Sequence, residues 1–305
     1  MSSPASRSRG PRRGGGPAAR ATRETPGSPA RHRFLDWDDY RAEREWRRYE
    51  GTPLRDLYRQ LRVRFLLRHQ AASPGWALEV GPGPGRFTGL IGSGGTRVAT
   101  LDMSRTMLGH VRSRFQDEGP VPDLVQGDAV LPPFVAGRFQ RVALLGNVLG
   151  FAEADAPALL RRVAGLVQPE GRLLLEFVAG PGEWSQYLHR LPPGALGRLM
   201  AAPIRAILPR VRAEGFSPVR EYREKARRFW RFAPEELSDR LRQEGLIVRE
   251  TLAVAPCLGN DASRLSEIRT SAKAWAHLLE VEEEVGHDAA RWASAAALLL
   301  AAERS

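Results

Sequence analysis

Two hydrophobic patterns alternate along the chain between residues 76 and 178. Short apolar runs, typical of strands buried on both faces, begin at Trp76, Arg97, Leu124, Phe139 and Arg172. Segments with apolar residues three or four positions apart, typical of amphipathic helices, separate these runs. Regular alternation of strand and helix requires parallel pairing and right-handed crossovers. The pattern therefore predicts an α/β fold in which helices cover both faces of a doubly wound, mostly parallel sheet.

Further elements are predicted before and after this alternating region. Residues 36–49 have a helical pattern, and Thr52-Pro53 starts a second helix with a capping residue and a proline at its first position. Near the other end, the sequence predicts a helix from Pro234 and a sixth strand over residues 246–254. The final apolar run, 295–302, favours helix and strand equally by propensity. Only the need for a closing, antiparallel seventh strand favours the sheet.

The segment 180–233 is not part of the alternating pattern. Apolar residues at helical spacing run from Leu196 to Val211 with arginines among them, and Pro203 and Pro209 interrupt or split the helix. This helical insert after the fifth strand has three interpretations, which are compatible with one another. It packs as a cap on the core, it closes as a lid over an acceptor, or it meets a lipid interface as a basic amphipathic element.

The first 33 residues consist of Ser, Pro, Gly, Ala and Arg with almost nothing large and apolar, which predicts a disordered tail. An organelle transit peptide is an alternative, although the prolines and glycines disfavour its amphipathic helix. We expect five parts: a disordered basic tail, an N-terminal helical cap, a ligand-binding core, a helical lid or insert, and the C-terminal part of the core sheet. Their bounds are 1–33, 34–72, 73–179, 180–233 and 234–305.

The formal net charge of +11 is concentrated in two segments. Residues 1–33 contribute +7 and residues 180–233 another +7, which leaves the rest of the chain at −3. Arginine supplies nearly all of the positive charge, because only Lys225 and Lys273 are lysines. A compositional bias of the genome could produce this preference as readily as selection for phosphate binding. The basic segments are compatible with a nucleic-acid partner but do not establish one.

Several classes of protein and site are disfavoured by composition. A single cysteine, Cys257, excludes an internal disulfide and a multi-cysteine metal site, and it fits a reducing compartment. No spacing of His, Cys, Asp and Glu suggests a metal site. No apolar run approaches the roughly 20 residues of a membrane span, and no signal peptide is evident. We therefore expect a cytoplasmic protein without a transmembrane segment.

Three glycines at alternate positions, Gly81, Gly83 and Gly85, follow the first strand directly. Glycine tolerates the positive φ of a tight turn and lets a ligand approach the backbone. The helix expected from Phe87 offers free N–H groups and the positive end of its dipole. This turn predicts a site for a small polar ligand at the carboxyl edge of the sheet. The spacing differs from the dinucleotide pattern G-x-G-x-x-G, because Arg86 stands at the position of the third glycine.

The stretch from Glu79 to Gly85 resembles the first motif of the class I S-adenosylmethionine-dependent methyltransferases, E-x-G-x-G-x-G. The segment that begins Leu101-Asp102-Met103-Ser104 resembles the family's second-strand segment, in which the acid binds the ribose hydroxyls and its neighbour lies near the adenine. The alternative role for Asp102 is to cap the next helix. Asp128, in Gly127-Asp128-Ala129, matches an acid that receives the adenine amino group in the family.

The resemblance implies a Rossmann-like seven-stranded sheet and S-adenosyl-L-methionine as the cofactor, with S-adenosyl-L-homocysteine as the product. It covers residues 76–178 well and 229–302 loosely. The residues that it assigns to cofactor binding are Glu79, Gly81, Pro82, Gly83, Gly85, Asp102, Met103, Asp128, Ala129, Gly146 and Asn147.

The end of the fourth strand, Gly146-Asn147, corresponds to the part of the family's fold beside the donated methyl group. Asn147 either orients an acceptor amine or hydroxyl, which makes it a candidate catalytic residue, or caps the next helix. The tetrapeptide N/D-P-P-Y/F, which holds planar base or amide nitrogens in related methyltransferases, is absent. We assign no general base, because methyl transfer needs mainly in-line placement and exclusion of water.

These observations predict a methyltransferase that acts on nitrogen, oxygen or carbon of a small-molecule or lipid-like acceptor. The alternative is an RNA methyltransferase that holds RNA with its basic tail and insert and therefore binds more weakly as salt rises. A non-catalytic cofactor-binding module is a third class, which nothing in the sequence favours. The acceptor and the oligomeric state do not follow from the sequence.

Overall fold

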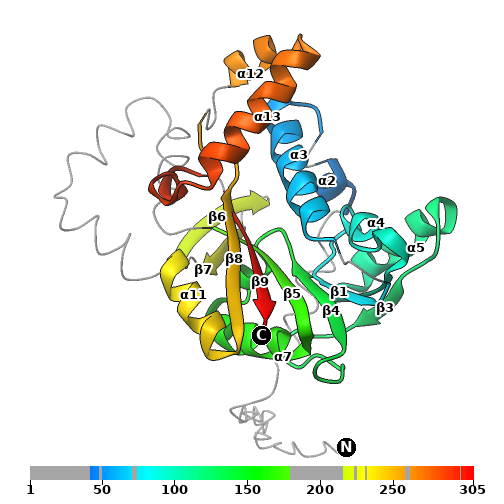
Figure 1. Cartoon of the computed structure of the whole chain (residues 1–305). Helices are drawn as coiled ribbons and strands as arrows, with labels where there is room; N and C mark the ends of the chain where they lie inside the picture. Colours follow the sequence, from blue (N-terminus) through cyan, green and yellow to red (C-terminus); the bar gives the residue numbers. More distant parts are fainter. Residues whose placement is uncertain are drawn as a thin grey trace, which may run out of the picture.

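A computed structural model describes residues 42–47, 50–70, 74–178, 216–222, 225–230, 232–257, 262–295 and 297–305. Helix and strand labels are those of Figure 1. The predicted tail, residues 1–33, lies outside the described residues, as does most of the predicted insert over 180–233.

Seven strands form one mixed sheet in the order β3-β2-β1-β4-β5-β9-β8. The strands are β1 Trp76–Val80, β2 Arg97–Asp102, β3 Asp123–Gln126, β4 Phe139–Leu144, β5 Val167–Phe177, β8 Leu246–Ala253 and β9 Leu298–Arg304. Strands β1 to β5 pair in parallel, whereas β9 is antiparallel to both of its neighbours. The predicted seven-stranded sheet with an antiparallel last strand is confirmed. The strand order reverses between β1 and β4, and the carboxyl edge at such a switch point is where open α/β sheets bind ligands.

The final apolar run is the strand β9, inserted between β5 and β8. Its side chains alternate between two cores: Leu298 and Leu300 belong to one, and Leu299 and Ala301 to the other. A strand that is buried on both faces carries an unbroken apolar run, which explains why propensity alone did not separate strand from helix here. Tertiary pairing decides the structure of this segment.

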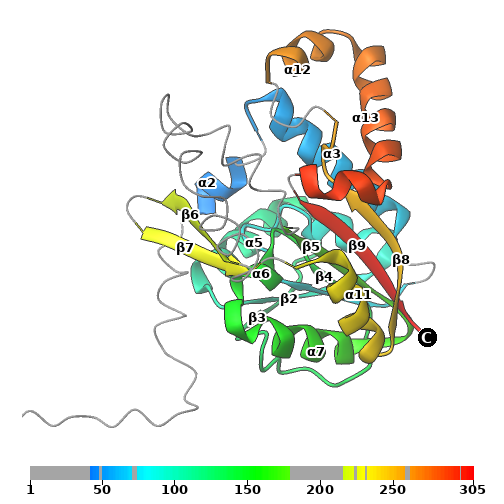
Figure 2. The same cartoon turned by 90° about the vertical axis from the view of Figure 1, so that its left-hand side faces the viewer.

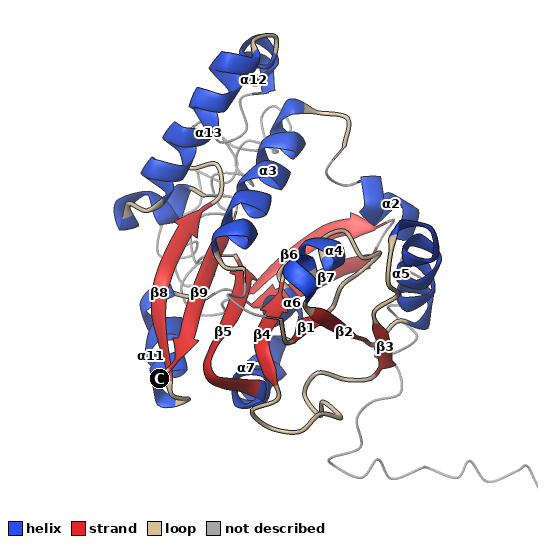
Figure 3. Ribbon diagram, turned by 45° about the vertical axis from the view of Figure 1, so that its right-hand side comes forward, coloured by secondary structure: helices blue, strands red, loops and turns tan. Residues whose placement is uncertain are grey.

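Helices cover both faces of the sheet, as Figure 3 shows. One core lies under α7 (Ala156–Leu166) and α11 (Pro234–Gln243). The other lies under α3 (Pro53–Arg68), α4 (Thr88–Ile91), α12 (Ala262–Arg269) and α13 (Ala272–Gly286). The remaining helical segments are α2 Ala42–Trp46, η2 Ser93–Gly95, α5 Arg105–Glu118, α6 Val148–Phe151, η3 Glu153–Asp155 and η4 Ala289–Ser294.

Helix α3 begins as its sequence predicts. The Thr52 hydroxyl accepts a hydrogen bond from the Arg55 amide at 3.3 Å, and Pro53 is the first helical residue. A β-branched N-cap and a proline at the first position satisfy or remove backbone donors that have no partner within the helix. The α3 residues Leu57, Leu61 and Phe65 are fully buried, so the predicted apolar face packs on the sheet.

The helix after the glycine turn is a single turn that ends before Gly92, as the sequence pattern implied. It comprises only Thr88–Ile91 and is followed by the 3₁₀ turn η2, in which Gly94 has φ +73°. Two adjacent glycines with positive φ, Gly94 and Gly95, end the helical conformation. A single helical turn has little macrodipole, so ligand binding at this edge depends mainly on the shape of the glycine turn.

The described part of the insert is not helical. Strands β6 (Phe216–Tyr222) and β7 (Lys225–Trp230) pair antiparallel as a separate two-stranded sheet, so the helical prediction is wrong for these residues. Strand β7 lies against α6 and η3, the segments that follow β4. Figure 2 shows this hairpin beside α6, at the carboxyl side of the parallel strands. Residues 196–211, where helix was predicted, lie outside the described part of the chain.

Candidate functional site

The glycine turn requires glycine at its first position for two separate reasons. Gly81 has φ +65°, and a Cβ atom built on it would lie 2.6 Å from Cγ2 of Val148. Gly83 and Gly85 also have positive φ, +54° and +86°. The Gly81 amide donates to the Leu101 carbonyl oxygen at 2.8 Å, and the Gly85 amide donates to the Pro82 carbonyl oxygen at 3.1 Å. These contacts hold a tight backbone turn against β2 and α6.

Glu79 is buried under this turn, with only 2% of its surface exposed. Its carboxylate accepts a hydrogen bond from the Thr88 hydroxyl at 2.5 Å, which ties β1 to the first residue of α4. Burial, with a smaller contribution from the nearby charge of Asp102, raises the pKa of Glu79 to about 7 against the lowering effect of the Thr88 bond. A buried carboxyl with a pKa near neutrality is typical of functional sites.

Asp102 and Asp128 follow neighbouring strands at one edge of the sheet. The Gly127 amide donates to the Asp102 carbonyl oxygen at 3.0 Å, which places the two acidic segments side by side. The Asp102 carboxylate accepts from the Ser104 amide at 2.8 Å, and the Asp128 carboxylate accepts from the Val130 amide at 2.9 Å. Ser104, rather than Asp102, is the N-cap of α5, because its hydroxyl accepts from the Met107 amide. Ser104 thus holds the N-cap position that the capping alternative assigned to Asp102.

Met103 and Ala129 are both partly exposed next to these acids. The Met103 carbonyl oxygen accepts from the Gln126 side chain at 3.2 Å, which links the ends of β2 and β3. Gly81, Asp102 and Asp128 thus follow three adjacent strands, β1, β2 and β3. The structure gathers the predicted positions at one edge of the sheet.

The turn after β4 carries the remaining predicted residues. Gly146 has φ +71°, and Asn147 has φ +64° and ψ +29°, a left-handed conformation that asparagine tolerates better than most side chains. Asn147 occupies the N-cap position of α6, but its side chain makes no capping hydrogen bond. Its side-chain oxygen instead accepts from the Val178 amide at 3.4 Å, and the residue is 8% exposed. Asn147 therefore joins the end of β4 to the end of β5.

A buried ion pair supports this turn, and no pattern in the sequence pointed to it. Glu176 on β5 and Arg62 on α3 are each 4% exposed. The Arg62 Nε donates to Glu176 at 3.0 Å, and a second guanidinium nitrogen forms a short bond with the same carboxylate. Glu176 also accepts from the Gly146 amide at 3.0 Å. The pair residues are 114 positions apart, and a helix-face arginine gives no sign of such a partner in the sequence.

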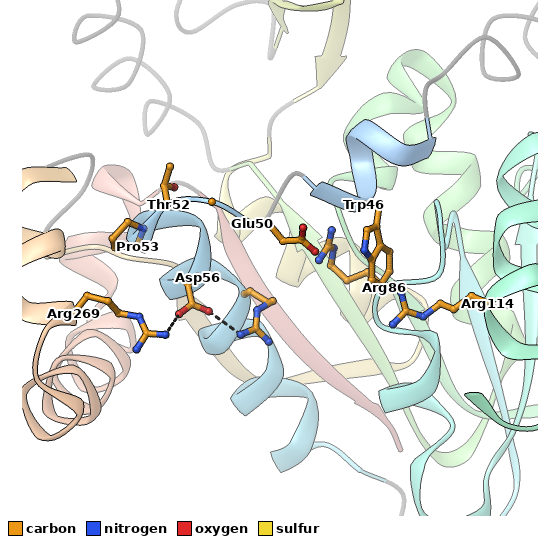
Figure 4. A pocket seen from close by; sticks show the side chains of 10 residues that line it. Trp46, Glu50, Thr52, Pro53, Asp56, Arg86, Arg114 and Arg269 are labelled. Carbon is orange, nitrogen blue, oxygen red and sulfur yellow. Dashed lines mark hydrogen bonds and ion pairs between the residues drawn. The ribbon is translucent and has the colours of Figure 1, made fainter. Parts of the chain in front are cut away.

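An open hollow of about 670 Å³ lies beside the glycine turn, between α2, α3, α5 and the end of α12. We call it the basic hollow, and Figure 4 shows its side chains. Its lining residues are Trp46, Glu50, Gly51, Thr52, Pro53, Asp56, Arg59, Arg86, Arg114 and Arg269. The sequence alone assigned none of these residues to a site, because they come from separate helices and loops.

Metal-binding clusters and membrane-spanning helices are both absent from the described residues. No group of three or more His, Cys, Asp or Glu side chains there is arranged to hold a metal ion. Among the helices of that same part of the chain, none is both long and apolar enough to cross a bilayer.

Residues 77–171 match a family model described as "Methyltransferase domain". A ribosomal RNA small subunit methyltransferase A from Synechococcus sp. (strain JA-2-3B'a(2-13)) is 34% identical over 122 residues, which are 37% of this chain and 42% of the relative. The same enzyme from Synechococcus sp. (strain JA-3-3Ab) is 33% identical over 118 residues, 36% of this chain and 41% of the relative. The chain thus spans less than half the length of the curated relatives it matches.

Solved structures resemble this chain at low sequence identity. The complex of the Haloferax volcanii Trm112 methyltransferase activator with a methyltransferase aligns with a TM-score of 0.51 at 15% identity, over 90% of this chain and 96% of that one. The Burkholderia thailandensis 1,6-didemethyltoxoflavin-N1-methyltransferase aligns with a TM-score of 0.49 at 15% identity, over 90% and 86%. The first of these likenesses, with a TM-score above 0.5, shows a shared fold. With the glycine turn and the acids at one edge of this sheet, the core that contains residues 77–171 belongs to the class I S-adenosylmethionine-dependent methyltransferase family.

Proposed function

We propose that the protein transfers the methyl group of S-adenosyl-L-methionine to nitrogen, oxygen or carbon of a small-molecule or lipid-like acceptor. The observation that carries the proposal is the shared edge at which the glycine turn, Asp102 and Asp128 meet. The backbone at Gly83, where an added Cβ would have no heavy atom within 4 Å, leaves room for a ligand to approach, and carboxylates suit hydroxyl and amino groups of a nucleoside. The sulfonium of the cofactor supplies an activated methyl group. The residues of the chain bind it, orient it and exclude water.

The acceptor is assigned to the edge formed by the ends of β4 and β5. Asn147 bonds the Val178 amide at 3.4 Å, and the Phe232 amide donates to the Val178 carbonyl oxygen at 3.4 Å. Both ends of the insert therefore meet beside Asn147. Strand β7 of the insert also lies against α6, which follows Asn147 directly. This arrangement supports a cover over an enclosed acceptor, with Asn147 as a residue that orients it.

The cofactor assignment is tested by calorimetric titration with S-adenosyl-L-homocysteine and, separately, with NADH. We expect binding of the nucleoside alone, and a loss of roughly tenfold or more in Asp102→Ala, because charged hydrogen bonds to a ribose diol disappear. Asp102→Asn keeps an acceptor for the Ser104 amide and guards against a folding defect. Asp123→Asn, an exposed acid at the start of β3, is the matched control and should bind normally. Preference for NADH would contradict the assignment.

RNA is the second candidate acceptor, favoured by the two ribosomal RNA methyltransferase relatives and by the basic charge of residues 1–33. The distinguishing measurement is transfer of a radiolabelled methyl group to total RNA and to a small-molecule extract. RNA binding should fall steeply between low and physiological salt, with a slope set by the number of phosphate contacts. Labelling of RNA that disappears on removal of residues 1–33 would replace the small-molecule proposal.

A further inference from the structure

Four arginines from separate parts of the fold line the basic hollow. Arg59 belongs to α3, Arg114 to α5 and Arg269 to the last position of α12. Arg86 follows Gly85 directly and so belongs to the end of the glycine turn. The acidic residues of the lining are Glu50 and Asp56, which leaves the hollow with a formal charge of +2. Guanidinium groups brought together in this way repel one another unless an anion lies among them.

Asp56 fixes two of these arginines at one side of the hollow. Its carboxylate accepts from Arg59 at 2.7 Å, from Gln60 at 2.8 Å and from Arg269 at 2.8 Å. Burial acts to raise the pKa of Asp56, but these bonds and charges outweigh it and hold the pKa below its usual value. Figure 4 shows Arg269 reaching Asp56 across the hollow's edge. A single ionised carboxylate therefore positions two cations without neutralising both.

Trp46 positions the other two arginines at the opposite side. The guanidinium carbon of Arg114 lies 3.6 Å from the centroid of the Trp46 ring, and that of Arg86 lies 4.5 Å from it. Arg86 also donates to the Glu45 carbonyl oxygen at 3.2 Å. An arginine has its five N–H donors in a rigid fork, so contacts of this kind fix the orientation of the whole group.

The size and chemistry of the hollow fit a small anionic ligand. Sites for small molecules occupy about 300–1,000 Å³ and combine an aromatic or apolar wall with a few converging polar groups. The volume of about 670 Å³ and the Trp46 wall match that description. Paired guanidinium groups recognise carboxylates and phosphates through two parallel hydrogen bonds. Single-stranded RNA is instead bound along an extended basic groove with several aromatic platforms, which a single hollow with one tryptophan and two acids does not provide.

We propose that the basic hollow binds the carboxylate or phosphate group of a small molecule, with Arg59 and Arg269 on one side and Arg114 and Arg86 on the other. The site lies beside the glycine turn and outside the residues assigned to cofactor binding. It does not depend on the proposed methyl transfer, because anion binding is measured without a reaction.

The test is calorimetric titration of the full chain with inorganic phosphate, and with citrate as a tricarboxylate, at constant ionic strength set by chloride. We expect saturable binding to the wild-type protein and a loss of roughly tenfold or more in the double variant Arg114→Gln/Arg269→Gln, because two forks are removed. Arg112→Gln, an exposed arginine on α5 that does not line the hollow, is the matched control and should bind as the wild type does.

Folding is checked by far-ultraviolet circular dichroism and by the melting temperature without phosphate. If the glutamine variant does not fold, the double variant Arg114→Lys/Arg269→Lys keeps both charges and removes only the forks. We then expect weaker phosphate binding than in the wild type. Unchanged phosphate and citrate binding in a folded double variant, or no binding of either anion by the wild type, would overturn the proposal.

Competition identifies the source of the anion. S-adenosyl-L-homocysteine carries an amino-acid carboxylate that 5′-methylthioadenosine lacks. Displacement of phosphate by the first compound alone would assign the hollow to the carboxylate of the cofactor. Displacement by neither would assign it to another small molecule, and both results retain the site. A single-stranded oligoribonucleotide that displaces phosphate at low salt, while citrate does not bind, would instead identify a nucleic-acid surface.

Discussion

Glu79 is a carboxylate buried beneath the glycine turn, and its burial makes the stability of the fold depend on pH. Burial raises its pKa from 4.5 to about 7. Between these values the folded protein holds a proton that the unfolded chain releases, so this contribution is fully present below pH 4.5 and is lost as pH rises to about 7. The total loss is roughly 3 kcal/mol, since one pKa unit corresponds to about 1.4 kcal/mol.

Glu79→Gln should remove this dependence, because glutamine can accept the Thr88 hydrogen bond without ionising. Urea unfolding at pH 5 and pH 8 should show the variant gaining stability relative to the wild type by about 2–3 kcal/mol over this interval. Glu235→Gln, an exposed acid at the start of α11, serves as the control and should follow the wild-type curve. Parallel pH curves for Glu79→Gln and wild type would show that the buried carboxyl does not titrate in this range.

Substitutions at Gly81 and Gly94 distinguish the two reasons for which a turn needs glycine, which are a positive φ and the lack of space for a Cβ atom. Both have positive φ, +65° and +73°, but only at Gly81 would a Cβ atom meet a neighbour, Cγ2 of Val148 at 2.6 Å. Gly94→Ala should therefore cost about 1–2 kcal/mol, which is the strain of the left-handed backbone alone. Gly81→Ala should cost more and should also weaken binding of S-adenosyl-L-homocysteine. Urea unfolding and calorimetry measure both effects, and Val148→Ala should recover part of the difference.

If Gly81→Ala and Gly94→Ala are equally destabilising, the contact between the glycine turn and α6 does not restrict the site. If Val148→Ala in the Gly81→Ala background recovers nothing, the added methyl group is accommodated in another way. The comparison remains informative because Gly94 is exposed and has no heavy atom within 4 Å of its added Cβ.

Some site residues were predictable from the sequence because they follow a strand directly. Gly81, Asp102 and Asp128 fall at the carboxyl ends of adjacent parallel strands, so strand order alone brings them to one edge. Their roles toward a cofactor stay predictions. Glu176 and Arg62 were not predictable, because their contact depends on how α3 packs across the sheet. A buried charge pair between distant segments leaves no periodic pattern in either one.

At the scale of elements, the sequence predicted the helices and strands whose local conformational preference agrees with their packing in the tertiary structure. The five parallel strands are apolar runs between helices, and all five are present. One difference lies in the insert, which was predicted as helical: residues 216–222 and 225–230 pair as the antiparallel strands β6 and β7. Helix α12 (Ala262–Arg269) was missed, because its weak periodicity becomes clear only when Leu265 packs in the core with α3 and α13.

The ion pair between α3 and β5 links two elements to the turn at Gly146. Removing one member of a buried pair leaves the other charge unsatisfied, so Glu176→Leu or Arg62→Leu alone should each destabilise the protein by about 3–5 kcal/mol. The double variant should cost at least about 2 kcal/mol less than the sum of the two, since no isolated charge is left. Urea unfolding of all four proteins measures this coupling.

A functional readout distinguishes support of the turn from general stability. Because Glu176 also accepts from the Gly146 amide, the double variant should lose affinity for S-adenosyl-L-homocysteine even where its stability has recovered. Additive stabilities would mean that the two charges are not coupled. Wild-type affinity in a stable double variant would mean that the Gly146 bond does not position the site.

The whole molecule separates a compact catalytic core from strongly basic segments. Residues 1–33 and 180–233 each carry a formal charge of +7, whereas the rest of the chain sums to −3. Folding stability and cofactor binding depend on packed elements of the core, whereas long-range attraction of polyanions depends on net charge and salt. These two properties should therefore respond independently to changes in the basic segments.

Removal of residues 1–33 tests this independence. The shortened chain should melt within about 2 °C of the full chain, because a change well below 1 kcal/mol shifts the midpoint of a domain of this size by no more than that. Its affinity for S-adenosyl-L-homocysteine should also be unchanged. Binding to single-stranded RNA at low salt should weaken, and the slope of log affinity against log salt should fall by about 0.7 for each phosphate that the tail no longer neutralises. Methyl transfer to a small-molecule acceptor should persist in the shortened chain. If this transfer and the labelling of RNA both disappear, the tail presents the acceptor, and the core alone would then not define the reaction.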